Sequence, residues 1–134
     1  MTKYFKIAFS LLVFILGFLA CRKDAPVDED GLLITDRAEC YVSNFELLGS
    51  DFVTVRSKAA VIDTVAQTVK VEVLFGTDLK NLYPQFSLVT DAKLEPKITG
   101  KVDFSDTLNP KTYTVISGNR KVRKPYKVFV SVQR

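Results

Sequence analysis

The chain has 134 residues, of which 47% are hydrophobic and 25% are charged, with five prolines and six glycines. This length allows one domain with a short appendage, and this composition excludes a disordered or low-complexity chain. The formal charge of +4 includes Lys3 and Lys6 near the amino terminus, and the remaining chain carries 17 basic and 15 acidic residues. Nucleic-acid binding needs a strong positive surplus on one face, so we do not expect a nucleic-acid partner.

Residues 1–20 have the three parts of a secretory signal peptide. Lys3 and Lys6 form a basic start, an apolar run of 14 residues extends from Ile7 to Ala20, and the small residue Ala20 ends the run. The alternative is a transmembrane helix, which needs about 20 apolar residues to cross about 30 Å of hydrocarbon. The run is too short for that alternative, so a signal peptide is expected.

Cys21 directly follows the apolar run. The segment Phe18–Cys21 resembles the lipobox of bacterial lipoproteins, in which the cysteine becomes the first mature residue and carries diacylglycerol. Two or three acyl chains, at about 0.8 kcal/mol for each buried methylene, hold a protein durably on a membrane. The resemblance implies that Cys21 is a lipid anchor and that the membrane is a partner. Cys40, the other cysteine, is then expected to be a small buried side chain without a disulfide.

Residues 21–38 are predicted to be the lipidated cysteine and a flexible tether, because charge, one proline and one glycine are typical of a solvated linker. The acidic residues that follow Cys21 also resemble the export signal of Bacteroidetes surface lipoproteins. That resemblance implies an outer-membrane lipoprotein exposed at the cell surface, with the periplasmic leaflet as the alternative location. The acidic residues are Asp24, Asp28, Glu29 and Asp30.

From Glu39 onward, apolar and polar residues alternate with the period of a β-strand. The clearest case is Thr68–Phe75, where Val69, Val71, Val73 and Phe75 are expected to share the inward face. Short turns rich in glycine, asparagine, aspartate and proline separate the segments. About seven short strands in about 95 residues predict an all-β fold, an immunoglobulin-like β-sandwich over residues 39–134. Strands are expected at Tyr41–Leu48, Phe52–Val55, Ala59–Ile62, Thr68–Phe75, Pro84–Val89 and Leu94–Ile98, around Tyr113 and Val115, and at Tyr126–Val132.

Three segments, Val42–Phe45, Gly76–Leu79 and Tyr126–Val128, resemble the immunoglobulin-like domains of unknown function in Bacteroidetes surface lipoproteins of the glycan-uptake-locus type. In larger members of that group, a separate C-terminal domain binds the glycan. The resemblance implies a non-enzymatic, lipid-anchored cell-envelope module that binds or scaffolds surface proteins or glycans. The alternative is a surface glycan-binding accessory protein of a polysaccharide-uptake system.

The sequence lacks the residues that most catalytic and metal sites need. Histidine, the commonest general base and metal ligand, does not occur. One thiol besides Cys21 cannot build a zinc site, and no glycine-rich phosphate loop is present. The acidic pairs Asp103 with Asp106 and Asp28 with Asp30 are expected to be solvated turns, not catalytic or calcium sites. We therefore expect no enzyme, no catalytic residue, no metal and no cofactor.

A dense run of basic residues is expected in the loop between the last two strands. Its charges either discourage edge-to-edge pairing of the terminal strand or contact an anionic partner, such as lipopolysaccharide phosphate or an acidic glycan. The residues are Arg120, Lys121, Arg123, Lys124 and Lys127.

Three aromatic residues are candidates for stacking on a sugar: Tyr41, Tyr83 and the outward-phased Phe129. The alternative is that each ring covers a sheet or its edge. Two further triplets, Asp63-Thr64-Val65 and Asp106-Thr107-Leu108, resemble the O-glycosylation acceptor motif of the same bacterial group. That resemblance implies that Thr64 and Thr107 carry glycans.

Overall fold

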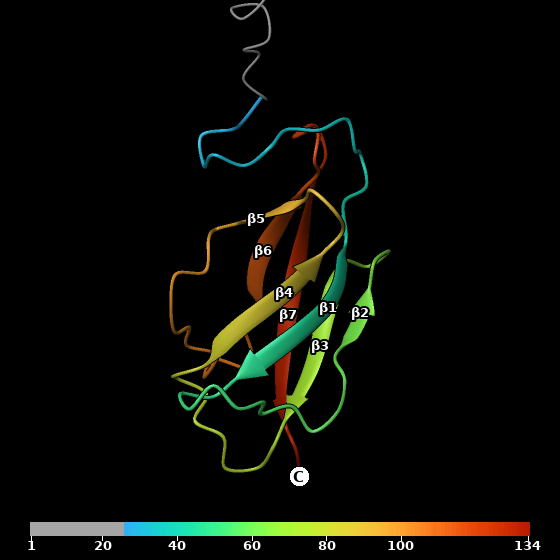
Figure 1. Cartoon of the computed structure of the whole chain (residues 1–134). Helices are drawn as coiled ribbons and strands as arrows, with labels where there is room; N and C mark the ends of the chain where they lie inside the picture. The colour runs from blue at the N-terminus through green and yellow to red at the C-terminus, as the bar shows by residue number, and fades with distance from the viewer. Residues whose placement is uncertain (1–25) are drawn as a thin grey trace, which may run out of the picture. The chain divides into compact units, whose positions relative to one another are not determined.

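The structure, a computed structural model, describes residues 26–134. Two β-sheets make up the fold (Figure 1). One sheet pairs β1 with β4, and the other has the strand order β2-β3-β7-β6-β5. Within the second sheet β3 and β7 run parallel, while the other neighbouring strands are antiparallel. The described part is all-β with seven strands, which confirms the predicted β-sandwich. The strands are β1 (Val42–Leu48), β2 (Val61–Asp63), β3 (Thr68–Val73), β4 (Tyr83–Leu88), β5 (Lys93–Glu95), β6 (Lys111–Ile116) and β7 (Arg123–Val132).

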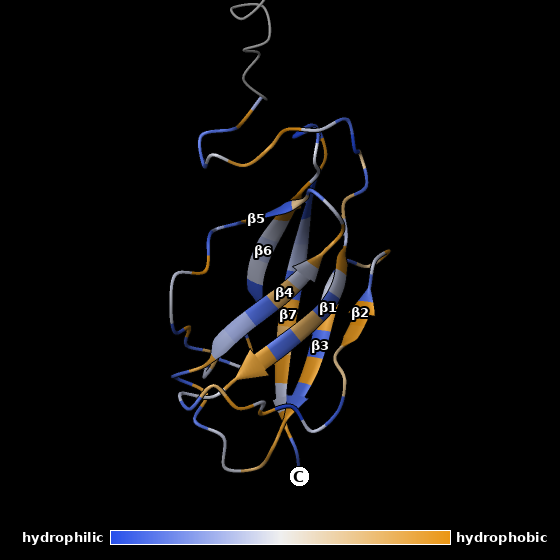
Figure 2. Ribbon diagram, viewed as in Figure 1, coloured by the Kyte–Doolittle hydropathy of each residue, from blue (hydrophilic) through white to orange (hydrophobic). Residues whose placement is uncertain are grey.

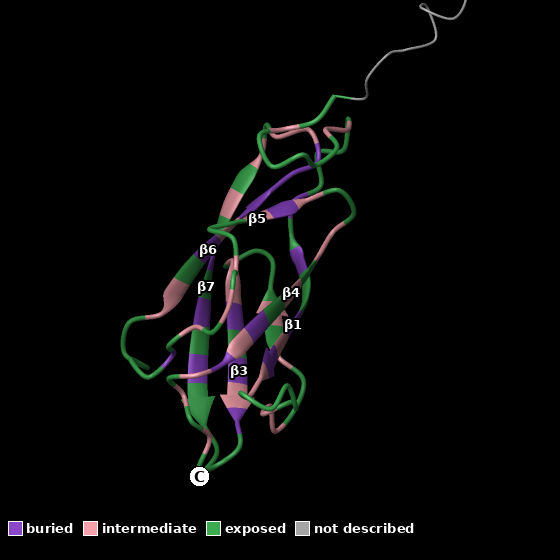
Figure 3. Cartoon of the chain, turned by 60° about the vertical axis from the view of Figure 1, so that its left-hand side comes forward, coloured by how far each residue is buried: buried purple, intermediate pink, exposed green. Residues whose placement is uncertain are grey.

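The core lies between the two sheets, where the apolar positions of each alternating strand meet (Figures 2 and 3). The Phe86 ring of β4 bridges the layers, because its centroid is 4.8 Å from that of Phe45 on β1 and 5.0 Å from that of Tyr113 on β6. Burial of these rings and of the valines of β3 and β7 supplies the main apolar contribution to folding. Residues that are almost fully buried include Phe45, Leu47, Val69, Val71, Val73, Val115, Tyr126 and Val128.

Two expectations about the strands were wrong. Phe52–Val55 forms no strand; its β-pairing is limited to the single bridges Leu48 with Thr54 and Arg56 with Val73, and Arg56 adds an ion pair to Glu46 at 2.7 Å. Phe75 does not join the inward face, because β3 ends at Val73 and the Phe75 ring is 83% exposed. A turn replaces the alternation there: the Thr77 amide donates to the Leu74 carbonyl, and Gly76 has a φ of 84°.

One compact unit runs from Leu33 to Arg134, and the predicted domain of residues 39–134 lies within it. The Thr35 amide donates to the Gly118 carbonyl at 2.9 Å, and the Asn119 amide donates to the Arg37 carbonyl at 2.8 Å. We call residues 33–39 the N-terminal segment. It reaches the sandwich at the end opposite to the carboxyl terminus (Figure 1).

The described residues before this unit form a turn of their own. Both the Asp30 and the Leu32 amides donate to the Asp28 carboxylate, at 3.0 and 2.9 Å. The predicted signal peptide, residues 1–20, and the predicted anchor Cys21 lie outside the described residues. Within residues 26–134 no helix has the length and apolar character that a membrane crossing requires.

Candidate functional site

The acidic side chains of the pair Asp103 and Asp106 accept hydrogen bonds within their own turns. Asp103 accepts a hydrogen bond from the Ser105 amide at 2.8 Å, and Asp106 accepts one from the Asn109 side-chain amide at 2.9 Å. Side-chain hydrogen bonds, from Ser105 to Asp103 and from Asn109 to Asp106, are the main reason that the pKa of each carboxyl lies below its usual value. Both groups are therefore ionised turn caps, and neither has the raised pKa of a general acid.

Residues 26–134 contain no group of three histidine, cysteine, aspartate or glutamate side chains placed to hold a metal ion. Cys40 is buried, as expected, and its thiol donates to the Val115 carbonyl with an Sγ to O distance of 3.1 Å. Burial raises the pKa of the Cys40 thiol, so it has little thiolate character near neutral pH. Cys40 is therefore a packing residue.

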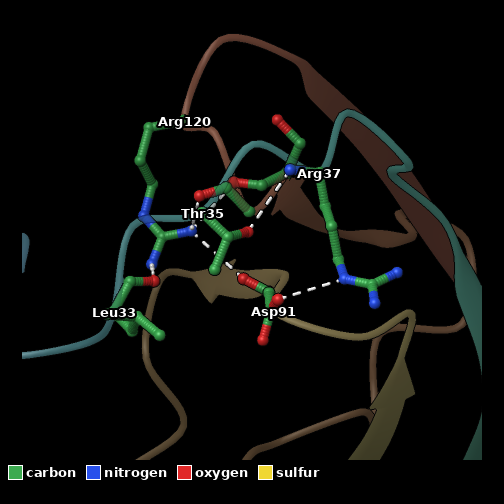
Figure 4. Close-up of polar contacts among 7 residues, drawn as sticks. Leu33, Thr35, Arg37, Asp91 and Arg120 are labelled. Atoms are coloured by element: carbon green, nitrogen blue, oxygen red, sulfur yellow. Dashed lines mark hydrogen bonds and ion pairs between the residues drawn. The ribbon is translucent and has the colours of Figure 1, made fainter. Parts of the chain in front are cut away.

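Arg120 holds three separate parts of the chain together (Figure 4). Its Nη1 donates to the carbonyls of Ser117, Asp91 and Gly118 at 2.9, 3.1 and 3.2 Å. Its Nη2 donates to the Leu33 carbonyl at 3.1 Å. We call this set of contacts the Arg120 clamp. Because the guanidinium points at backbone carbonyls, most of its hydrogen-bonding capacity is used within the molecule.

Two further features brace the N-terminal segment at the same place. The Arg37 side chain pairs with the Asp91 carboxylate at 3.3 Å, as Figure 4 shows. Gly118 lies so close that a Cβ there would stand 2.5 Å from the Thr35 hydroxyl oxygen. The predicted anionic-partner residue Arg120 is therefore the centre of a packed junction.

The other basic candidates do not gather in one loop. β7 begins at Arg123, so Arg123, Lys124 and Lys127 belong to the strand, which corrects their predicted place in the preceding loop. Arg123 pairs with Glu95 of β5 at 2.7 Å. Arg123 and Lys127 share the exposed face of β7, whereas Lys124 alternates with them and lies on the other face. Contact with an anionic partner stays a prediction, and the exposed Lys121, Arg123 and Lys127 are its candidates.

The three aromatic candidates lie in different places. Tyr41 is exposed just before β1, and Phe129 is exposed on the outer face of β7 beside Lys70 of β3. Tyr83 is the first residue of β4 and lies opposite Leu48, the last residue of β1. The structure does not bring the three rings together. Tyr83 instead meets Phe52.

Phe52 and Tyr83 form an aromatic pair at the end of the sandwich where β1 ends and β4 begins. The ring centroids are 4.6 Å apart and the ring planes are inclined by 23°, which is a stacked arrangement. Lys101 places its Nζ 6.0 Å from the centroid of the Tyr83 ring. The Phe52 side chain is 65% exposed. From the sequence, Tyr83 was predicted as a stacking candidate, whereas Phe52 was assigned to an expected strand. The turn residues Gly49-Ser50-Asp51 were the only sequence feature that pointed to a turn near Phe52.

The two threonines of the predicted glycosylation triplets lie in similar turns. Asp63 accepts hydrogen bonds from the amides two and three residues later, each at 2.9 Å, and Asp106 accepts the equivalent bonds at 3.2 and 3.3 Å. The apolar residues that complete the triplets, Val65 and Leu108, are 91% and 89% exposed. Thr64 and Thr107 therefore lie in protruding turns, and their modification stays a prediction.

A hollow of about 530 Å³ is lined by Asp36, Arg37, Ala38 and Glu39 and is open to solvent. A second, of about 10 Å³, lies beneath the turn between Phe104 and Lys111. Neither encloses converging polar groups of the kind that a small-molecule site needs.

Comparisons with known proteins find one matching family and similar folds in proteins of Bacteroides. Residues 50–130 match the family model described as SGBP, N-terminal, where SGBP denotes a surface glycan-binding protein. A candidate glycoside hydrolase of Bacteroides thetaiotaomicron is 26% identical, with a TM-score of 0.60 over 84% of this chain and 28% of its own. A candidate secreted protein of Bacteroides fragilis is 12% identical, with a TM-score of 0.50 over 72% of this chain and 97% of its own.

A DUF4623-family protein of Bacteroides eggerthii is 19% identical, with a TM-score of 0.51 over 72% of this chain and 22% of its own. This chain therefore spans about a quarter of the length of two of these three neighbours. A search of curated proteins found no match.

Proposed function

This chain belongs to the SGBP N-terminal family, and we propose that it is a non-enzymatic, lipid-anchored surface module that binds or presents glycans. The observation that carries the proposal is the family match, which runs from the loop after β1 into β7 and so covers most of the sandwich. The family and the secreted neighbour also indicate a protein of the cell surface or the secreted fraction. The more specific role, a glycan-binding accessory of a polysaccharide-uptake system, is supported by the family description.

Four acidic turn residues lack the properties of a general acid. Glycoside hydrolysis uses two carboxyl groups about 5–10 Å apart across a bound sugar, one of them with a raised pKa. Asp63, Asp78, Asp103 and Asp106 all have lowered pKa values, because each accepts hydrogen bonds from its own turn. The candidate hydrolase of B. thetaiotaomicron is much longer, and this chain spans 28% of it.

The anchor that we propose is Cys21, with an outer-membrane location exposed to the exterior. Twelve residues, 21–32, separate the beginning of the predicted tether from the compact unit. Because residues 28–32 fold into a turn that the Asp28 carboxylate caps, the extended length of the tether is less than twelve residues would allow.

The test compares the full-length protein with Cys21→Ala in Bacteroides cells, with Cys40→Ala as a control that removes the other thiol. We expect wild type and Cys40→Ala in the membrane fraction, and Cys21→Ala in the soluble fraction. A protease added to intact cells should cleave the wild-type protein. Retention of Cys21→Ala in membranes would contradict the lipid anchor, and full protection from the protease would contradict the surface location.

Glycan binding is tested separately with a soluble fragment, residues 33–134, which corresponds to the compact unit. We expect the fragment to bind at least one polysaccharide on a glycan array. A fragment that melts cooperatively yet binds none of them would contradict the glycan-binding role and favour a protein-scaffolding role.

A further inference from the structure

The turn that carries Phe52 has an unusual backbone for a large aromatic residue. Phe52 has a φ of 60°, in the left-handed region that side chains with a bulky Cβ disfavour. Glycine occupies this region at Gly31 and Gly76. The turn is closed by two hydrogen bonds of 2.9 Å, from the Gly49 amide to the Val53 carbonyl and from the Phe52 amide to the Gly49 carbonyl. Strained backbone of this kind is concentrated at functional sites.

The Phe52 ring lies at the surface of the domain. Tyr83 stacks on one face of the ring at a centroid distance of 4.6 Å, yet the residue Phe52 remains 65% exposed. Because Tyr83 occupies one face, the opposite face and the edge of the ring are the parts that a ligand can contact. Tyr83 is itself held by its pairing with Leu48 at the start of β4. The pair is a pre-formed flat apolar surface, and such pre-organisation lowers the entropic cost of binding.

Polar groups surround this surface. Leu82 and Val102 exchange backbone hydrogen bonds of 3.2 and 2.8 Å, which brings the neighbouring Lys101 to the Tyr83 ring. Asp51 precedes Phe52 in the turn, and its carboxylate accepts a hydrogen bond from the Val53 amide at 3.2 Å. Charges of both signs therefore flank the rings. This arrangement does not favour a strongly charged ligand of either sign.

From these observations we propose that Phe52 and Tyr83 form a stacking platform for one ring of a neutral sugar chain. A pyranose ring presents a face of C–H groups and a rim of hydroxyls. The C–H face packs on the open face of Phe52, and the hydroxyls reach hydrogen-bonding groups such as Lys101 and Asp51. The inference rests on the proposed glycan-binding function and assigns it a site.

The platform lies far from the N-terminal segment. β1 begins near that segment and ends next to the Phe52 turn, so the platform and Leu33 lie at opposite ends of the sandwich (Figure 1). A ligand on the platform therefore does not meet the Arg120 clamp.

The test replaces Phe52 by asparagine in the soluble fragment of residues 33–134. Asparagine tolerates a positive φ, so Phe52→Asn removes the ring without adding backbone strain. The matched control is Phe75→Asn. Phe75 is an even more exposed phenylalanine in the next loop at the same end, and it has no ring partner among the described residues. Retention of the folded state is checked by thermal melting.

Binding is measured by affinity gel electrophoresis in xyloglucan, galactomannan, mixed-linkage β-glucan and amylopectin, with polygalacturonate and heparin as anionic probes. Loss of an aromatic contact surface weakens binding by several-fold to about tenfold. We expect wild type and Phe75→Asn to bind at least one neutral polymer equally, and Phe52→Asn to bind it about tenfold more weakly. Oligosaccharides of that polymer should shift the ring signals of Phe52 and Tyr83 in NMR spectra.

Each other result would overturn the inference. Equal binding by wild type and Phe52→Asn places the sugar elsewhere and leaves the proposed function intact. Binding to the anionic polymers alone contradicts the neutral ligand. Concentration-dependent dimerisation that Phe52→Asn abolishes, without sugar binding, assigns the platform to self-association. Failure of the wild-type fragment to bind any polymer removes both the platform and the glycan-binding role.

Discussion

Replacing Arg120 by lysine is expected to destabilise the domain although it keeps the positive charge. The arginine guanidinium donates to four backbone carbonyls, of Leu33, Asp91, Ser117 and Gly118. A lysine ammonium has three donors on one atom and cannot reproduce the planar fork that reaches both sides of this junction.

The expected loss follows from the hydrogen bonds. A hydrogen bond from a charged donor contributes about 1.5–3 kcal/mol to stability, with the lower end suited to a partly exposed group. The Arg120 Nη1 group shares its two hydrogens among three carbonyls, and we expect the lysine ammonium to replace some of these hydrogen bonds. We therefore expect Arg120→Lys to lower the free energy of unfolding by about 2 kcal/mol. For a domain of this size the melting temperature should fall on the order of 10 °C.

Differential scanning calorimetry measures the shift, and amide hydrogen exchange locates it. The amides of Thr35 and Asn119, which join the N-terminal segment to the turn before β7, should lose protection in Arg120→Lys. Amides within β3 should keep theirs. Lys121→Ala is the control, because Lys121 is exposed and its stability effect should stay within about 0.5 kcal/mol. If Arg120→Lys melts like the wild type and Thr35 stays protected, the guanidinium does not hold the junction.

Gly118→Ala places a Cβ 2.5 Å from the Thr35 hydroxyl oxygen and should cost about 1–3 kcal/mol in urea unfolding; an unchanged midpoint would contradict this packing. Tyr126→Phe should alter the free energy of urea unfolding by at most about 1 kcal/mol, because the buried Tyr126 hydroxyl lies near the Val42 backbone but makes no well-aligned hydrogen bond in residues 26–134; a larger loss would contradict this. Burial raises the pKa of Tyr126 in the folded state, so the unfolded chain ionises first and the wild type loses stability as the pH rises above about 10. Tyr126→Phe lacks this loss, and parallel pH–stability curves for the two proteins would refute the reasoning. Glycans at Thr64 and Thr107 should add mass to the native protein that is lost stepwise in Thr64→Ala and Thr107→Ala, and a native mass that contains lipid alone would disprove them.

Local alternation was enough to predict the most regular strands. In β3 and β7 every second residue is apolar, so the inward faces of Val69, Val71, Tyr126 and Val128 were predicted correctly. The parallel pairing of β3 with β7 could not be predicted in this way. These strands lie about fifty residues apart in the sequence, and their register depends on how both sheets pack.

The candidate site was only half visible in the sequence. Tyr83 was predicted as a stacking residue, but Phe52 begins a run with high β-propensity and was assigned to a strand. Hydrogen bonds from the Gly49 amide to the Val53 carbonyl and from the Phe52 amide to the Gly49 carbonyl close a turn instead, and no residue pattern signals a phenylalanine with positive φ. Arg120 was likewise interpreted as a surface contact, because two of its partners, Leu33 and Asp91, are distant in sequence.

The two ends of the sandwich differ: one holds the N-terminal segment and the other carries the aromatic pair. At one end the Arg120 clamp fixes the N-terminal segment to the turn between β6 and β7, so a pull on Leu33 is transmitted to the whole sandwich. At the other end stands the pair Phe52 and Tyr83. β7 alone has ten residues and, at about 3.4 Å per residue, spans about 34 Å. The aromatic pair is therefore separated from the Arg120 clamp by roughly this length, so a ligand can occupy the pair without disturbing the contacts that hold the N-terminal segment.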